Sequence, residues 1–171
     1  MIYVNGNLIT VEKNPKKAEV LLRDYLIKKK LVLVNNNDEP VSFQDLSEIL
    51  LGNSKEIKLK GISSSIILRE FKEELHNYIL RVEQYIEVSR QNENYSSMLD
   101  NFVQVVEAII EFSKIGNFLQ KELVSHQQIN NISTMAFEQA KVGNKEYILD
   151  LLEYELLPVL NFVFDETNEV M

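Results

Sequence analysis

The segment IKLKGISSSIILREF, residues 57–71, divides the chain into two kinds of pattern. Its first part, Ile57-Lys58-Leu59-Lys60, alternates between apolar and charged residues, which is the period of a strand and predicts a final strand at the edge of a sheet. From Ser63 onward the apolar residues recur every three to four positions, which is the period of a helix. We therefore expect a small α/β domain over residues 1–61 and a helical domain over residues 62–171.

The first 61 residues predict the element order β-β-α-β-α-β. The Asn5-Gly6 pair lies between two β-prone runs and is a strong hairpin signal, because both residues tolerate positive φ. Pro15 suits the first turn of a helix, and Ser42 opens a second helix. The six elements are expected at about residues 2–4, 8–11, 15–29, 31–34, 42–52 and 57–60.

The remaining residues predict an all-α antiparallel bundle of about four helices, so the expected fold class is α+β. The first helix carries an apolar stripe and ends near Arg90, and the third begins after Ser125, which fits a capping box with Gln128. Asn144 can cap the last helix. Pro158 should kink that helix around residues 155–157 unless the helix ends there.

The second helix of this bundle, expected over about residues 96–124, is apolar on nearly every side around its middle. A helix of this kind requires burial all round. Two arrangements satisfy that requirement. The helix lies at the centre of the fold, or it supplies an interface between subunits.

Composition restricts the classes of function. The chain has no cysteine, which excludes disulfides, thiolate metal sites and cysteine nucleophiles. Its start lacks the pattern of a signal peptide, and charges interrupt its most apolar stretch, so we expect a cytoplasmic protein without a membrane span. Residues 1–61 carry a net charge of +2 and residues 62–171 a net charge of −10, which disfavours binding to nucleic acid. The basic run Lys28-Lys29-Lys30 is either a solvated helix end or a docking site for an acidic partner or a membrane surface.

Neither a catalytic nor a cofactor motif stands out in the sequence. The five glycines are too scattered for a phosphate-binding loop or a dinucleotide fingerprint, and Ser63-Ser64-Ser65 lacks the turn of a nucleophile elbow. We therefore expect that the protein uses no cofactor. A non-enzymatic protein is a better fit to the sequence than an enzyme.

A metal-carboxylate helical bundle is the alternative. Glu73 lies three residues before His76, and Glu122 lies four before His126, so each pair lies on one helix face. Only the first pair has the Glu-x-x-His spacing of di-iron bundles.

The run NKEYILDLLEYELLP, residues 144–158, resembles the C-terminal part of a group of uncharacterised helical proteins of Gram-positive bacteria. The resemblance covers about the last third of the chain and implies a helical fold. In size, acidity and helical content the chain is also similar to bacterial flagellar and type III export chaperones, although no motif supports that similarity.

These patterns favour a protein-interaction module, an adaptor or a chaperone, that binds a protein partner or forms a homodimer. Excess apolar surface on the middle and last helices is the reason. The residues expected at the interaction surface are Val105, Ile109, Phe112, Tyr154 and Leu157.

Overall fold

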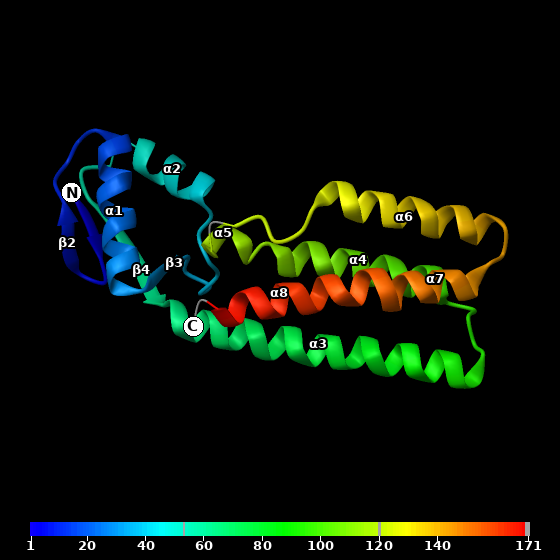
Figure 1. Ribbon diagram of the computed structural model, residues 1–171. Coiled ribbons are helices and arrows are strands. Elements are labelled where there is room, and N and C mark those ends of the chain that lie inside the picture. The colour runs from blue at the N-terminus through cyan, green and yellow to red at the C-terminus, as the bar shows by residue number, and fades with distance from the viewer. Residues whose placement is uncertain (53, 120, 170–171) are drawn as a thin grey trace. The chain divides into compact units, whose positions relative to one another are not determined.

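The computed structural model describes residues 1–52, 54–119 and 121–169 of the chain. Its helices and its small four-stranded sheet confirm the α+β class (Figure 1). The chain divides into two compact units, Met1–Arg69 and Glu70–Met171. The boundary falls within the long helix α3 (Ser64–Asn92).

The sheet of the first unit has the strand order β2-β1-β4-β3. β1 (Ile2–Val4) and β2 (Asn7–Thr10) form an antiparallel hairpin. β1 runs parallel to β4 (Ile57–Ser63), and β4 pairs antiparallel with β3 (Leu31–Val34). The sheet is therefore mixed, and β4 joins its two halves.

Because β4 has a neighbour on each side, the prediction that it lies at the edge of the sheet is wrong. Ile57 and Leu59 pack against the buried core of the unit, whereas Lys58 and Lys60 are exposed. The alternation of apolar and charged residues over residues 57–60 therefore indicates that one face of the sheet packs against the core and the other faces solvent. It carries no information about whether a strand has one neighbour or two.

The hairpin turn predicted at Asn5-Gly6 is present, and the Asn5 side chain ties it to β4. The two residues have φ of 49° and 80°, the left-handed values that this turn requires. Asn5 Nδ2 donates to the carbonyl of Gly61 at 2.8 Å, and Asn5 Oδ1 accepts from the Gly61 amide at 2.9 Å. These two bonds fix the turn beside the strand that pairs with β1.

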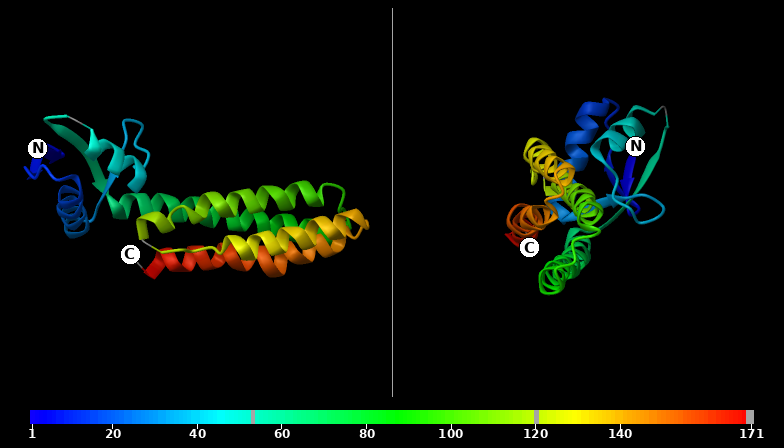
Figure 2. Two further views of the ribbon diagram at one scale, coloured as in Figure 1. Left: turned by 90° about the horizontal axis from the view of Figure 1, so that it is seen from above. Right: turned by 90° about the vertical axis from the view of Figure 1, so that its right-hand side faces the viewer.

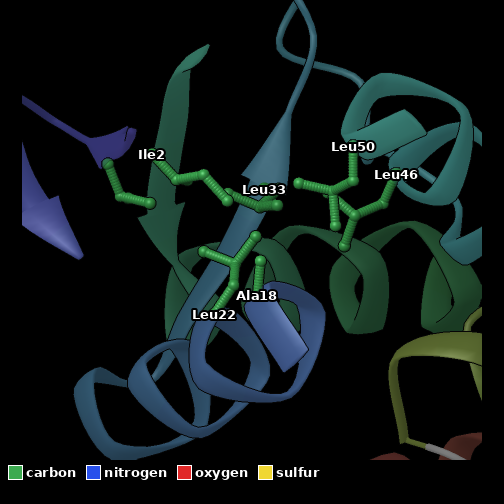
Figure 3. Packing of buried hydrophobic residues seen from close by; sticks show 7 residues of the cluster. Ile2, Ala18, Leu22, Leu33, Leu46 and Leu50 are labelled. Carbon is green, nitrogen blue, oxygen red and sulfur yellow. The ribbon is translucent and has the colours of Figure 1, made fainter. Parts of the chain in front are cut away.

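Two helices cover the core face of the sheet. The first turn of α1 (Pro15–Lys29) is capped by Asn14, and that of α2 (Phe43–Leu51) is capped by Ser42. Their apolar sides meet the strands in one cluster. Figure 3 shows its members, which include Ile2, Ala18, Leu22, Leu33, Leu46 and Leu50.

The second unit is helical. Besides its part of α3, it contains α4 (Met98–Ser113) and α6 (His126–Lys141), and α4 packs against α6 and against the last helical segment of the chain. In Figure 2, α3 and α6 lie on opposite sides of α4 and that last segment. α4 and the last segment therefore both lie between α3 and α6.

The predicted second helix of the bundle, over about residues 96–124, is too long. α4 ends at Ser113 and is followed by the short helix α5 (Gly116–Leu119). The Gly116 carbonyl accepts from the Lys121 amide at 2.9 Å, and a Cβ at position 116 would overlap the carbonyl oxygen of Lys121. The chain therefore folds back tightly on Gly116, which a continuous helix cannot do.

The last helical segment contains α7 (Lys145–Leu151), the π-helical turn η1 (Leu152–Leu156) and α8 (Leu157–Glu169). The distortion that Pro158 predicts at residues 155–157 thus takes the form of a wider turn one residue before the proline. The Leu157 amide donates to the carbonyl of Leu152, five residues back. Because a proline ring clashes with the carbonyl four residues before it, this widening accommodates Pro158 without ending the helix.

The interior of the second unit can be tested at Phe102, which is fully buried on α4. We expect Phe102→Ala to lower the free energy of unfolding by about 3–5 kcal/mol, because the substitution removes a large apolar side chain and leaves a cavity. Denaturant unfolding followed by circular dichroism measures the change. Phe162→Ala removes a half-exposed ring and should change stability by no more than about 0.5 kcal/mol. Equal losses in the two variants would contradict this packing.

Candidate functional site

The structure places the predicted residues of α4 inside the second unit. Val105 and Ile109 are buried, and they belong to a stripe with Met98 and Phe102 that faces the interior. Phe112 is partly buried and contacts two rings of α3, Phe71 and Tyr78, with centroids 5.7 and 5.4 Å away. These three side chains therefore pack within the unit, while Gln104, Glu107 and Glu111 of α4 stay exposed.

Tyr154 and Leu157 lie on the last helical segment and have a different environment. Tyr154 is 65% exposed within the π turn, and Leu157 is partly buried beside it. The same segment exposes two other aromatic side chains, Tyr147 at 38% and Phe162 at 49%. We call Tyr147, Tyr154 and Phe162 the outer aromatic stripe.

The π turn brings Tyr154 and Phe162 closer to one face of the helix. Tyr154 and Phe162 are eight residues apart, and in a regular α-helix they would be separated by about 80° around the axis. The π turn takes up one additional residue in all, and part of it falls between Tyr154 and Phe162, so their separation is smaller than in a regular helix. The sequence pattern indicated Tyr154 as an interaction residue but missed Phe162. The reason is that the additional residue of the π turn shifts the apolar repeat of the helix at that point.

The opposite side of the segment is anchored in the core. Its buried residues repeat every three to four positions and hold the helix against α4 and α6. They are Ile148, Leu149, Leu151, Leu152, Leu156, Leu160 and Val163. The outer aromatic stripe is thus carried by a helix whose other face is fully buried.

Arg90 of α3 fixes the π turn from the side. Its Nε donates to Glu153 Oε2 at 2.8 Å, its Nη2 donates to Asp150 Oδ1 at 2.7 Å, and Nη2 also contacts Glu153. Hydrogen bonds to Asp150 and Glu153 raise the pKa of Arg90 further above its ordinary value. Arg90 therefore stays charged and holds the residue that immediately precedes Tyr154.

The stripe is bordered by free acidic groups. Glu146, Glu155 and Asp165 are exposed, and within the described residues none of the three forms an ion pair. Asp150 and Glu153 are held by Arg90 instead. The helical segment that carries the stripe therefore also carries three exposed carboxylates that form no ion pair among the described residues.

The four predicted metal ligands do not form a metal site in the described part of the chain. Glu73, His76, Glu122 and His126 are all exposed, and the His76 ring lies 5.7 Å from the Phe164 ring. No group of three or more histidine, cysteine, aspartate or glutamate side chains there is arranged to hold a metal ion. The metal alternative stays a prediction that no contact in this structure favours.

The basic run lies at the end of α1. Lys28 and Lys29 occupy its last turn, and Lys30 follows in the left-handed conformation with its amide donating to the Ile27 carbonyl. Cations are favourable at this end of a helix, so the placement by itself needs no partner.

Comparisons with family models, with curated proteins and with solved structures find no match to this chain. The resemblance of residues 144–158 to helical proteins of Gram-positive bacteria therefore stays a prediction. Across the residues described, none of the helices has the length and apolar character needed to cross a bilayer.

The Arg90 contacts predict a measurable contribution to stability. We expect Arg90→Gln to lower the free energy of unfolding by about 1 kcal/mol, since the bonds are charge-assisted but partly exposed to solvent. Lys114→Gln, which removes an exposed pair with Glu111, should cost less than about 0.5 kcal/mol. Denaturant titrations at low and high salt measure both losses. A loss at Arg90 no greater than that at Lys114 would contradict the anchoring role.

Tyr78 predicts a pH effect at the contact between α3 and α4. Burial raises the pKa of its phenol, and nearby Arg81 opposes the shift. The folded state therefore retains the proton at alkaline pH where the unfolded chain, with a pKa of about 10, loses it. Stability should fall as pH rises above about 10, and Tyr78→Phe should reduce that slope. An unchanged slope in unfolding experiments at alkaline pH would contradict this assignment.

Proposed function

We propose that this protein is a non-enzymatic protein-interaction module whose second unit binds a basic amphipathic helix along the outer aromatic stripe. The observation that carries the proposal is the exposure of Tyr154, 65%, at the centre of a helix whose opposite face is buried. In the cell such a module would act as an adaptor or as a chaperone for a helical segment of another protein.

The chemistry of the stripe supports a helical partner. Aromatic side chains, tyrosine above all, contribute large apolar area at low cost in conformational entropy and are common anchors of interfaces. Tyr147 and Phe162 are fifteen residues apart, which corresponds to about 22 Å along a helix. A partner helix of about four turns can contact all three rings, in the way amphipathic helices bind apolar surfaces.

The charge around the stripe supports a basic partner. The carboxylates of Glu146, Glu155 and Asp165 form no ion pair in the described part of the chain, and the region after Gly61 has a net charge of −10. Lysine or arginine side chains flanking an apolar face would neutralise these groups and speed association. An acidic helix would be repelled by the same groups.

Arg90 supports the proposal as a positioning residue. By holding Asp150 and Glu153, it keeps two of the nearest carboxylates neutralised within the unit and fixes the π turn that carries Tyr154. The aromatic ring is thus presented from a rigid segment, and a preorganised surface loses less entropy on binding.

The proposal predicts a specific loss of binding in matched variants. A synthetic amphipathic helical peptide with leucines along one face and lysines beside them is the probe, and fluorescence anisotropy measures its affinity. Phe162→Ala and Tyr154→Ala should each weaken binding about tenfold, the loss typical of an interface anchor. Phe137→Ala is the control, since that ring lies on α6 and is 47% exposed, close to the 49% of Phe162. Its effect should stay below about twofold.

Three results would contradict the proposal. Equal losses at Phe137 and Phe162 would mean that the peptide binds acidic surface without using the stripe. Equal affinity for a peptide with glutamates in place of the lysines would remove the charge argument. Self-association that depends on Phe162, measured by sedimentation, would make a second copy of the chain the partner instead of a basic helix.

A further inference from the structure

The helix α1 of the first unit has an exposed side that combines apolar and basic side chains. Its inner side carries Ala18 and Leu22, which belong to the cluster shown in Figure 3. On the opposite side, the exposed residues from position 16 to position 28 fall within about 140° around the helix axis. Apart from Asp24, they are all apolar or basic, and we call them the outer face of α1. They are Lys16, Lys17, Val20, Leu21, Ile27 and Lys28.

Three aliphatic side chains of the outer face are exposed to solvent. Ile27 is 67% exposed, Val20 is 58% exposed and Leu21 is 47% exposed. The packing of α1 against the sheet does not use them, because other positions, which include Tyr25 and Leu26, contact the core. Single exposed aliphatic residues are ordinary, but several of them on one helix face with charges around them mark a surface for binding.

Basic side chains surround these aliphatic residues. Residues 12–30 contain seven basic and three acidic residues, which gives a net charge of +4. The one arginine, Arg23, pairs with Glu19, whereas the six lysines form no ion pair among the described residues. A partner that matches the outer face therefore carries negative charge and has an apolar part.

The residue types of the outer face favour a lipid surface over a macromolecule. Protein interfaces are enriched in aromatic residues and arginine and depleted in lysine, and the exposed residues of this face include neither an aromatic residue nor an arginine. Nucleic acid would leave the aliphatic side chains without a contact, since its phosphates take polar groups and its bases stack on aromatic rings. Lysine suits a bilayer, because its stem lies along apolar surface while its ammonium group stays among the headgroups.

We infer that α1 lies along the surface of an anionic bilayer with its outer face toward the lipid. The lysines contact the acidic headgroups, and Val20, Leu21 and Ile27 enter the boundary between headgroups and acyl chains. Each lysine near such a surface raises the binding constant about fivefold. The attachment is therefore reversible and sensitive to salt. This inference concerns the first unit and does not rest on the proposed function of the second.

Sedimentation of the full chain with lipid vesicles tests this inference. Vesicles of phosphatidylcholine with about 30% phosphatidylserine should bind the protein at least about tenfold more tightly than vesicles of phosphatidylcholine alone. Raising the salt concentration from about 50 mM to about 500 mM should release it. Ile27→Ser should weaken binding about fivefold to tenfold, because it removes an apolar side chain that enters the lipid. Lys16→Gln combined with Lys28→Gln should weaken it about tenfold or more.

Each change has a matched control. Leu8→Ser removes an aliphatic side chain that is 53% exposed on β2, and it should leave vesicle binding unchanged. Leu8 lies on the face of the sheet opposite to α1, since its neighbour Ile9 packs against the core. Lys58→Gln combined with Lys141→Gln removes the same charge from other elements and should weaken binding less than about twofold. All of these side chains are exposed, so the variants should fold, and circular dichroism checks that they do.

Four results would overturn the inference. They are an absence of binding to the phosphatidylserine vesicles at low salt, equal affinity for the two kinds of vesicle, and equal losses in Ile27→Ser and Leu8→Ser. The fourth is binding of a soluble acidic peptide through the same lysines without binding to vesicles, which would make an acidic protein the partner. The vesicle assay and the peptide titration of the outer aromatic stripe use different probes and different residues, so the failure of either proposal is distinguishable from the failure of the other.

Discussion

Pro158 has no amide hydrogen, and the last helix of the chain is arranged around that constraint. An α-helix would bring the proline ring against the carbonyl of Tyr154, whereas the π turn over Leu152–Leu156 widens the backbone at that point. The helix continues to Glu169, so its inner face still fills the core of the second unit. On the outer face, the additional residue of the π turn reduces the angle around the helix axis between Tyr154 and Phe162. Pro158 thus accounts for the π turn, and the π turn brings Tyr154 and Phe162 closer to one face of the helix.

Local signals in the sequence predicted local structure well. The Asn5-Gly6 turn and the helix starts after Ser42, Ser125 and Asn144 appear where the sequence places them. Each depends on neighbouring residues only, since a positive φ or a side-chain cap is decided within one turn.

Features that depend on distant parts of the chain could not be predicted in the same way. The alternation of residues 57–60 could not reveal that β1 and β3 both pair with β4. The break at Gly116 depends on the backbone of Lys121 closing on it. Val105 and Ile109 are as apolar as interface residues, and only the packed helices show that they face inward.

The second unit carries the surface that we propose as the binding site for a partner. We propose that its outer aromatic stripe and the exposed carboxylates of the same segment bind a basic amphipathic helix, and Arg90 holds the π turn that carries Tyr154. The most direct measurement is to map a ¹⁵N-labelled sample of the full chain by NMR as the lysine-flanked peptide is added. If the peptide binds along the stripe, the perturbed amide signals will cluster over residues 146–165. Signals that shift mainly on α6 or in the first unit, or an absence of shifts, would contradict it.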